Sequence, residues 1–227
     1  GVRLTEQEYT GFAKKKGQTQ YDLVGACLEN DYYNSLDDEG KAKVISDMYS
    51  LSKKVASAYV KDDYTSTDKV FNIYQEGGAQ AVLDYMKYRD SVKSAGIESS
   101  SERTQAIYDN LGDEGLKLYS EAKAQYGDDE KMSAGNLIPF LDSKSLTSSQ
   151  KGEYMANFTT LAKGAQQFAD KGDYAKVYQY YNIKSNADSD GNGSLKKQEL
   201  IDYLDGTGMS TEEKRTWFSI LSTAKNP

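Results

Sequence analysis

The sequence has no histidine and only one cysteine among its 227 residues. Histidine is the most frequent general base and the usual partner of a nucleophilic serine or cysteine, so its absence excludes the commonest hydrolase arrangements. A single cysteine permits neither an internal disulfide nor a cysteine-based zinc site. Cys27 lies in the apolar run 23–28, and we expect it to be a buried thiol of the core.

Proline and long apolar runs are also scarce. The two prolines are Pro139 and Pro227, so almost nothing interrupts a helix. No stretch approaches the roughly 18 apolar residues that indicate a membrane-spanning helix. No signal peptide is visible. Because the sequence opens on Gly1 rather than on methionine, we expect a processed product or a piece of a longer protein.

Positive charge is outweighed by negative charge. The formal net charge is −7, which argues against binding to a phosphate backbone and predicts no nucleic-acid partner. We expect no membrane partner either. What the chain does contain is 19 tyrosines and 6 phenylalanines, and these supply the apolar bulk for a core.

Helix signals recur along the whole sequence. Thr5, Ser99, Thr147 and Ser210 are each followed three residues later by Glu or Gln, which is the pattern of a capping box at a helix start. No alternating apolar pattern indicates a strand, so the sequence predicts an all-α fold, a multi-helix array. The expected helices cover residues 5–16, 19–30, 37–60, 67–76, 79–94, 101–110, 113–125, 133–142, 147–170, 173–186, 196–205 and 210–223.

An internal repeat divides the chain. Residues 137–155 align without a gap on residues 200–218, at an offset of 63, and the two stretches share their leucines and the position of their helix cap. This register favours a true duplication. We therefore predict an N-terminal helical region at 1–110 and a duplicated helical unit at 111–227.

The segment 188–199 reads DSDGNGSLKKQE and has the pattern of a calcium loop. Such a loop needs oxygen ligands at positions 1, 3, 5, 7, 9 and 12, with glycine at position 6 for the sharp turn. Gly193 occupies position 6 and Leu195 is the apolar residue at position 8. The predicted metal ligands, at positions 1, 3, 5, 7 and 12, are Asp188, Asp190, Asn192, Ser194 (through its carbonyl) and Glu199.

This loop and the helix that follows it resemble the EF-hand family, and the resemblance implies that one Ca²⁺ binds here. Two positions depart from the family pattern. Lys196, at position 9, offers no carboxylate, so a water would have to serve as ligand. Lys184 stands where the family usually has an apolar residue. The alternative reading is a solvated Asp/Gly turn between two helices.

EF-hands usually occur in pairs, and the duplication predicts the partner. Shifting the loop back by 63 residues gives 125–136, QYGDDEKMSAGN. Met132 then takes the place of Leu195, but the ligand positions are lost. We expect a paired EF-hand-like unit, with a degenerate, metal-free loop at 125–136 and the intact loop at 188–199. The only expected strand contact is a two-residue pairing near Met132 and Leu195.

Three longer segments resemble the C-terminal part of large bacteriophage and prophage virion structural proteins. They read LTEQEYTGFAKKKGQTQYD, YYNSLDDEGKAKVISDMYSLSKKVA and DSDGNGSLKKQELIDYLDGTGMSTEEKRTWF. The resemblance implies a structural or internal component of a virion, located there or in the host cytoplasm, with no enzymatic role.

Three functional hypotheses follow. The first is a calcium-binding structural or interaction domain of a phage particle, with other virion subunits as its partners and calcium rigidifying its C-terminal unit. The second is a calcium sensor that exposes a partner-binding groove when the ion binds. The third, which we favour least, is an enzyme that uses the carboxylates of 37–39 or 128–130. A sensor usually has two working loops, so one intact loop favours the first hypothesis.

Overall fold

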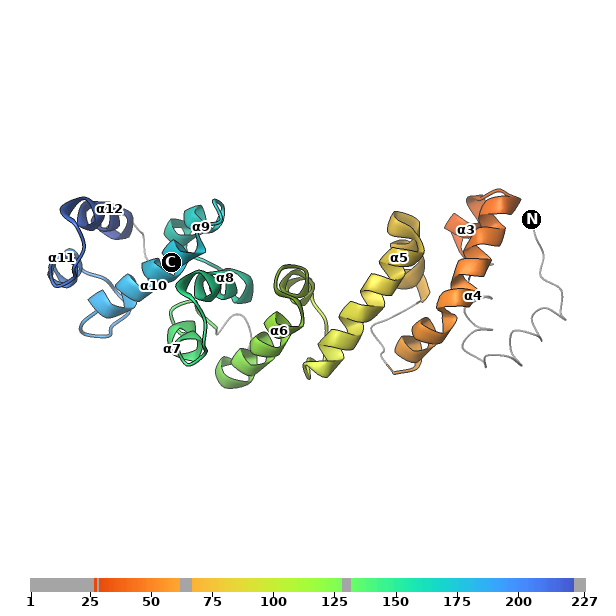
Figure 1. The fold of residues 1–227 in the computed structure, drawn as a ribbon, viewed down its shortest axis with the longest axis horizontal. Coiled ribbons are helices and arrows are strands. Elements are labelled where there is room, and N and C mark those ends of the chain that lie inside the picture. Colours follow the sequence, from red (N-terminus) through yellow and green to blue (C-terminus); the bar gives the residue numbers. More distant parts are fainter. Residues whose placement is uncertain (1–26, 28, 62–66, 128–131, 223–227) are drawn as a thin grey trace. The chain divides into compact units, whose positions relative to one another are not determined.

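The computed structural model describes residue 27 and residues 29–61, 67–127 and 132–222, in which it contains helices and turns but no strand. The predicted all-α fold is therefore confirmed for the described residues (Figure 1). The expected helix at 5–16, and nearly all of the one at 19–30, lie outside them. The helices are α3 (Asp31–Ser35), α4 (Asp38–Lys61), α5 (Thr67–Ser94), α6 (Glu102–Tyr126), α7 (Leu137–Asp142), α8 (Ser148–Phe158), α9 (Lys163–Ala169), α10 (Tyr174–Ala187), α11 (Lys197–Asp205) and α12 (Thr211–Ser222).

Two of these helices are each broken by one glycine. Gly78 in α5 has φ 71° and ψ −163°, and Gly112 in α6 has φ 67° and ψ −156°. Residues with a Cβ rarely adopt a positive φ, so glycine is the residue that tolerates these kinks. The breaks fall where the sequence separates 67–76 from 79–94 and 101–110 from 113–125. Those predicted divisions are confirmed.

The predicted single helix at 147–170 is wrong, because the chain leaves the helical conformation after Phe158. Thr159 is extended, with φ −148° and ψ 175°, and its hydroxyl donates a buried hydrogen bond of 2.6 Å to the Met132 carbonyl. The Ala162 amide donates a 2.7 Å bond to the Tyr181 hydroxyl just before α9 begins. Partners far away in the sequence therefore stabilise a break that local helix propensity does not show.

The chain divides into two compact units, Gly1–Ser100 and Ser101–Pro227. In the first unit α4 packs against α5 and α3 packs against α4. The stripe predicted within 37–60 faces this core. The buried residues of the core are Cys27, Tyr33, Val44, Met48, Leu51, Val70, Phe71, Tyr74, Val82 and Met86.

Cys27 is fully buried, as expected, and burial raises the pKa of its thiol to about 12. A thiol of this kind stays protonated and unreactive at neutral pH. The Tyr74 hydroxyl donates a hydrogen bond to the Asp47 carboxylate, which also pairs with Lys43 at 2.8 Å. These contacts tie α5 to α4 at the edge of the core.

In the second unit α10 is the central helix. It packs against α8, α9 and α11 and, less extensively, α12, while α6 packs against the opposite part of α8. The ribbon shows α7, α8 and α9 gathered beside α10, with α11 and α12 at its far end (Figure 1). The C-terminal end of α10 therefore delivers the chain to the predicted calcium loop.

The contact between α8 and α10 depends on one glycine. A Cβ placed on Gly152 of α8 would lie 1.8 Å from the Tyr174 carbonyl oxygen of α10. This distance is far below any normal contact, so the two backbones touch only because Gly152 has no side chain.

Candidate metal centre

Two helices hold the loop 188–199 at its ends. α10 ends at Ala187, directly before Asp188, and α11 begins at Lys197, which is position 10 of the loop. The two glycines of the loop have positive φ, with Gly191 at 64° and Gly193 at 78°. Both are positions at which a residue with a Cβ would be strained. The local sequence therefore forms a tight turn between two helices, as predicted for positions 1 to 12.

The three acids of the loop come together. Asp188, Asp190 and Glu199 each offer one carboxylate oxygen, and these oxygens lie within 4.8 Å of one another. Such a group can hold a metal ion, and within the described residues it is the only group of at least three Asp, Glu, Cys or His side chains that does so. Asp188 and Glu199 are half-buried and Asp190 is exposed.

Backbone amides of the turn orient the first two acids. The Asp188 carboxylate accepts hydrogen bonds from the amides of Asn192 at 3.2 Å and Gly193 at 2.8 Å. Asp190 also accepts one from the Asn192 amide, at 3.2 Å. Because these donors are in the backbone, the loop itself fixes the two carboxylates on the inside of the turn.

The third acid is oriented from the start of α11. Glu199 accepts hydrogen bonds from the Ser189 hydroxyl at 3.1 Å and from the Lys196 amide at 3.0 Å. The second of these bonds spans the N-terminus of α11, where a carboxylate also satisfies a free amide of the first turn. Glu199 therefore closes the loop from position 12 back towards position 2.

The remaining two predicted ligands belong to the same turn. The Asn192 side-chain oxygen accepts a hydrogen bond of 2.8 Å from the Ser194 amide. This is a local side-chain to backbone bond of the kind that stabilises turns. The structure thus places all five predicted residues in one loop and brings the carboxylates of three of them together.

Lys196 adds a positive charge to the cluster. Its ammonium lies 3.1 Å from an oxygen of Asp190, and this hydrogen bond holds the pKa of Asp190 below its ordinary value of 3.8. The same contact raises the pKa of Lys196 above 10.5. The sequence prediction treated position 9 only as a missing carboxylate and did not anticipate this ion pair.

The predicted degenerate loop at 125–136 is described only at its ends, because residues 128–131 lie outside the described residues. Gln125 belongs to α6, which ends at Tyr126, and Met132 is fully buried. No strand or bridge forms at Met132 or Leu195. The Met132 carbonyl instead accepts the hydrogen bond from Thr159.

A cleft of about 560 Å³ lies between the two loop regions. Residues 133–136 and the segment 160–162 line one side, and Tyr181 and Lys184 of α10, together with Asp188, Gly193 and Leu195, line the rest. The two loops therefore face a common space without pairing.

The duplication extends to the helices and their polar contacts. α7 and α11 end 63 residues apart, at Asp142 and Asp205, and α8 and α12 begin 63 residues apart. Lys151 pairs with Asp142 at 2.8 Å, and the matching Lys214 lies 3.7 Å from Asp205. Shared ion pairs at matching positions support the predicted repeat.

The structure also extends the repeat upstream. Gly112 separates the two halves of α6, and Gly172, with φ 71°, lies between α9 and α10. Each copy is thus a helix, a glycine kink, a second helix, a loop and two short helices. Sequence comparison missed this extension, although the shared Gly-Asp at 112–113 and 172–173 is a signal for it.

The apolar faces of α8 and α12 were expected to bury each other, and the structure differs. Tyr154 and Phe158 of α8 form edge contacts, and Phe158 also meets Tyr119 of α6 at a ring distance of 5.3 Å. Trp217 of α12 lies 5.6 Å from Phe168 of α9. Each face therefore has a different aromatic partner, because α8 packs along α10 over its length.

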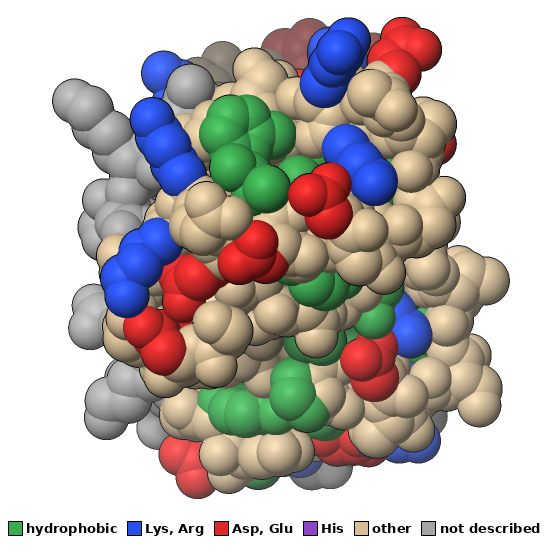
Figure 2. Space-filling view, turned by 90° about the vertical axis from the view of Figure 1, so that its left-hand side faces the viewer, with side chains coloured by type: hydrophobic (Ala, Val, Ile, Leu, Met, Phe, Trp, Pro, Cys, Tyr) green, Lys and Arg blue, Asp and Glu red, His purple; other side chains and the backbone are tan. Residues whose placement is uncertain are grey.

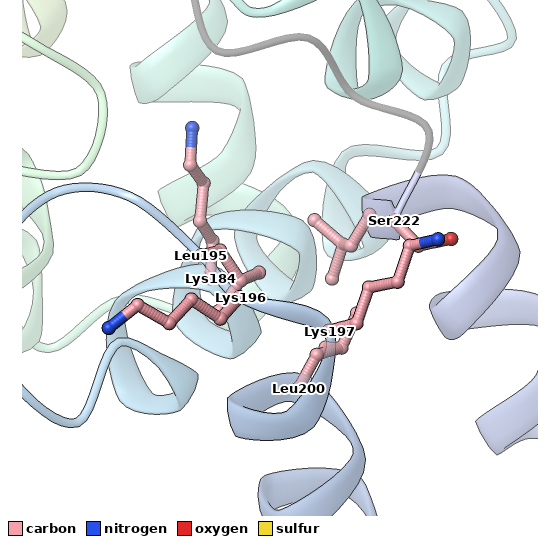
Figure 3. A pocket seen from close by; sticks show the side chains of 7 residues that line it. Lys184, Leu195, Lys196, Lys197, Leu200 and Ser222 are labelled. Atoms are coloured by element: carbon pink, nitrogen blue, oxygen red, sulfur yellow. The ribbon is translucent and has the colours of Figure 1, made fainter.

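A smaller cavity of about 50 Å³ lies between the loop and α12, lined by Leu195, Leu200 and Ser222 among others. Three lysines surround it, but Figure 3 shows the ammonium groups of Lys184, Lys196 and Lys197 pointing in three different directions. They do not converge on a common point, as the ligands of an anion would.

The surface around α11 and α12 carries mixed charge. Figure 2 shows acidic and basic side chains interspersed on this side, with the apolar surface divided into separate patches. Ile201 of α11 is the one large apolar side chain among the described residues that is exposed, at 38%. No described helix is both long enough and apolar enough to cross a membrane.

No protein-family model matches this chain, and no curated protein or solved structure matches it significantly.

Proposed function

We propose that the second unit binds one Ca²⁺ through Asp188, Asp190, Asn192, the Ser194 carbonyl and Glu199. The observation that carries the proposal is the approach of three carboxylates within 4.8 Å in a turn that runs from the end of α10 to the start of α11. Three acids placed this close together repel one another, and a divalent cation relieves that repulsion.

The chemistry of the ligands favours calcium over other metals. All predicted ligands are oxygens, and a chain without histidine and with one buried cysteine offers no soft or imidazole ligand. Magnesium demands near-ideal octahedral geometry at short distances, whereas calcium accepts six to eight oxygens in a flexible loop. We therefore expect calcium to bind and magnesium to compete poorly.

Calorimetric titration of the whole chain with CaCl₂ tests this proposal, with one ion per chain as the expected result. Binding stabilises the folded state by RT ln(1 + [Ca²⁺]/Kd), about 2.7 kcal/mol at a hundredfold excess over Kd. Two ions per chain, or a melting temperature that EDTA leaves unchanged, would contradict the proposal.

Glu199→Gln is the decisive variant, because it removes one acid and the bidentate ligand of position 12 while keeping the shape of the side chain. We expect it to abolish most of the calcium-dependent shift in melting temperature. Asp202→Asn is the matched control, since Asp202 lies on the same helix and its side chain bonds to Gln198. A similar loss in both variants would indicate a general charge effect.

We further propose that calcium rigidifies the unit rather than switching it. Trp217, the single tryptophan, contacts Phe168 and is 5% exposed, so its fluorescence reports on this packing. We expect a blue-shifted emission that calcium changes little. A large red shift, or binding of a hydrophobic dye that requires calcium, would favour the sensor hypothesis.

The proposed setting is a phage virion, in which the chain is a structural or interaction domain that contacts other protein subunits. Support for this comes from the resemblance of three sequence segments. Mass spectrometry of gradient-purified particles tests it, and the chain is expected in the particle fraction. Its recovery only from the soluble fraction of the host would contradict the virion assignment.

A further inference from the structure

All six carboxylate oxygens of the acid cluster accept a hydrogen bond, but only one of the donors is charged. Five donors are backbone amides or the Ser189 hydroxyl, and all of these belong to the turn or to the first turn of α11. The sixth is the Lys196 ammonium, at 3.1 Å from Asp190. The cluster therefore already has a partial counter-ion, supplied by its own chain.

Lys196 is placed to compete for the same oxygen as an incoming ion. It stands at position 9 of the loop, on the side where a ligand or a bridging water is usual. An ammonium and a divalent cation beside one carboxylate repel each other, because both are positive and only a few ångströms apart. Binding of the ion therefore requires the Lys196 side chain to leave Asp190.

We propose that Lys196 is a tethered cation that sets the calcium affinity of this loop by competing for Asp190. This inference rests on the proposed calcium site and adds a specificity-determining residue to it. It makes the site a weak one, which loads only when calcium is plentiful. Extracellular calcium modules occupy that end of the EF-hand affinity range, at Kd values of about 10⁻⁴–10⁻³ M.

Lys196→Gln tests the proposal, because glutamine keeps the aliphatic stem and the backbone amide that bonds to Glu199 while removing the charge. Lys197→Gln is the matched control: the neighbouring side chain is exposed, carries the same charge and makes no ion pair with the cluster acids. Calorimetric titration of the whole chain with CaCl₂ gives Kd for each variant and for the wild type.

We expect Lys196→Gln to bind calcium about threefold to tenfold more tightly than the wild type, which is the size of effect that one exposed ion pair and its repulsion of the ion can produce. Lys197→Gln should gain less than half as much on a logarithmic scale. The gain of Lys196→Gln should shrink in about 0.5 M salt, since exposed charges are then screened.

Lys196→Asp adds a further reading, because it replaces the competitor by a possible ligand. Its affinity should exceed that of Lys196→Gln. Equal gains from Lys196→Gln and Lys197→Gln, or no gain from either, would overturn the role of Lys196 while leaving the calcium site in place. No calcium binding by the wild type, Lys196→Gln or Lys196→Asp would overturn the site itself, and the role of Lys196 with it.

Discussion

At the scale of the residue, single atoms decide where the helices of the second unit can meet. Gly152 has no room for a Cβ because the Tyr174 carbonyl oxygen occupies that space. Gly164 is tight in the same way, since a Cβ there would lie 2.9 Å from the Tyr180 ring. The crossing of α8 and α9 with α10 therefore depends on two hydrogen atoms in place of side chains.

We predict that Gly152→Ala destabilises the second unit by about 1–3 kcal/mol or more, the cost of forcing extra atoms into a packed contact. Gly208→Ala should stay within about 0.5 kcal/mol of the wild type, because nothing lies within 4 Å of its Cβ position. Urea unfolding followed by Trp217 fluorescence measures both. Equal stability of the two variants would show that the α8–α10 contact adjusts without cost.

The loop acids and Gly152 differ in how far the sequence predicts them. Asp188, Asp190 and Glu199 are brought together by a turn of twelve residues, so their spacing alone predicts the cluster. Gly152 faces a carbonyl 22 positions further along the chain, and Lys196 pairs through the orientation of a long side chain. Neither a distant packing partner nor a rotamer is encoded in local spacing, which is why both emerged only from the structure.

At the scale of the element, a polar contact fixes α10 to α7. The Tyr178 hydroxyl donates a 2.6 Å hydrogen bond to Asp142, which also accepts one of 2.8 Å from Lys151. Burial and the contact with Asp142 raise the pKa of Tyr178 to about 12. Burial alone would raise the pKa of Asp142, but the bonds from Lys151 and Tyr178 hold it below 3.8.

These shifts set the pH range in which the contact stabilises the fold. Because the folded-state pKa of Tyr178 is raised, its contribution is complete below pH 10.0 and is lost between there and about 12. The folded-state pKa of Asp142 is lowered, so its contribution is present above pH 3.8 and is lost as the pH falls below that value. The α7–α10 contact is therefore intact across the neutral range.

We predict that Tyr178→Phe lowers the free energy of unfolding by roughly 0.5–1.5 kcal/mol at pH 7, the net value of one hydrogen bond. The difference from the wild type should diminish as the pH rises from 10 towards 12, where the wild type loses the same contact. Tyr174→Phe, on the same helix, is the control. Unfolding measured at several pH values checks this, and a difference that is constant up to pH 12 would contradict it.

The helices themselves were largely predictable, and the exceptions have identifiable causes. Caps and glycines mark the ends of α6, α8 and α12 in the sequence, and the structure places those ends within a few residues of the prediction. The break between α8 and α9 was not predicted, because it depends on bonds from Thr159 to Met132 and from Ala162 to Tyr181. Such long-range bonds override local propensity.

At the scale of the whole molecule, the chain consists of two compact units with separate cores. We predict that urea unfolds it in two steps, because units of this kind do not share one cooperative transition. Calcium should shift only the step that Trp217 reports, since both the loop and Trp217 belong to Ser101–Pro227. The first unit should unfold alike with CaCl₂ and with EDTA.

Parallel circular dichroism and fluorescence traces check this prediction. Circular dichroism follows both units, whereas the tryptophan follows only the second. A single transition seen identically by both probes, and shifted as a whole by calcium, would show that the two units unfold as one.

The position of Gly152 has a consequence for anyone who would lengthen this protein by design. In the second copy the matching residue, 63 positions on, is Arg215, which is exposed on α12. A helix laid on α12 in the way that α10 lies on α8 would meet a guanidinium where its backbone needs bare space. Repeat arrays commonly finish in a unit with a polar outer face. Concatenating further copies would therefore first require Arg215 to become glycine.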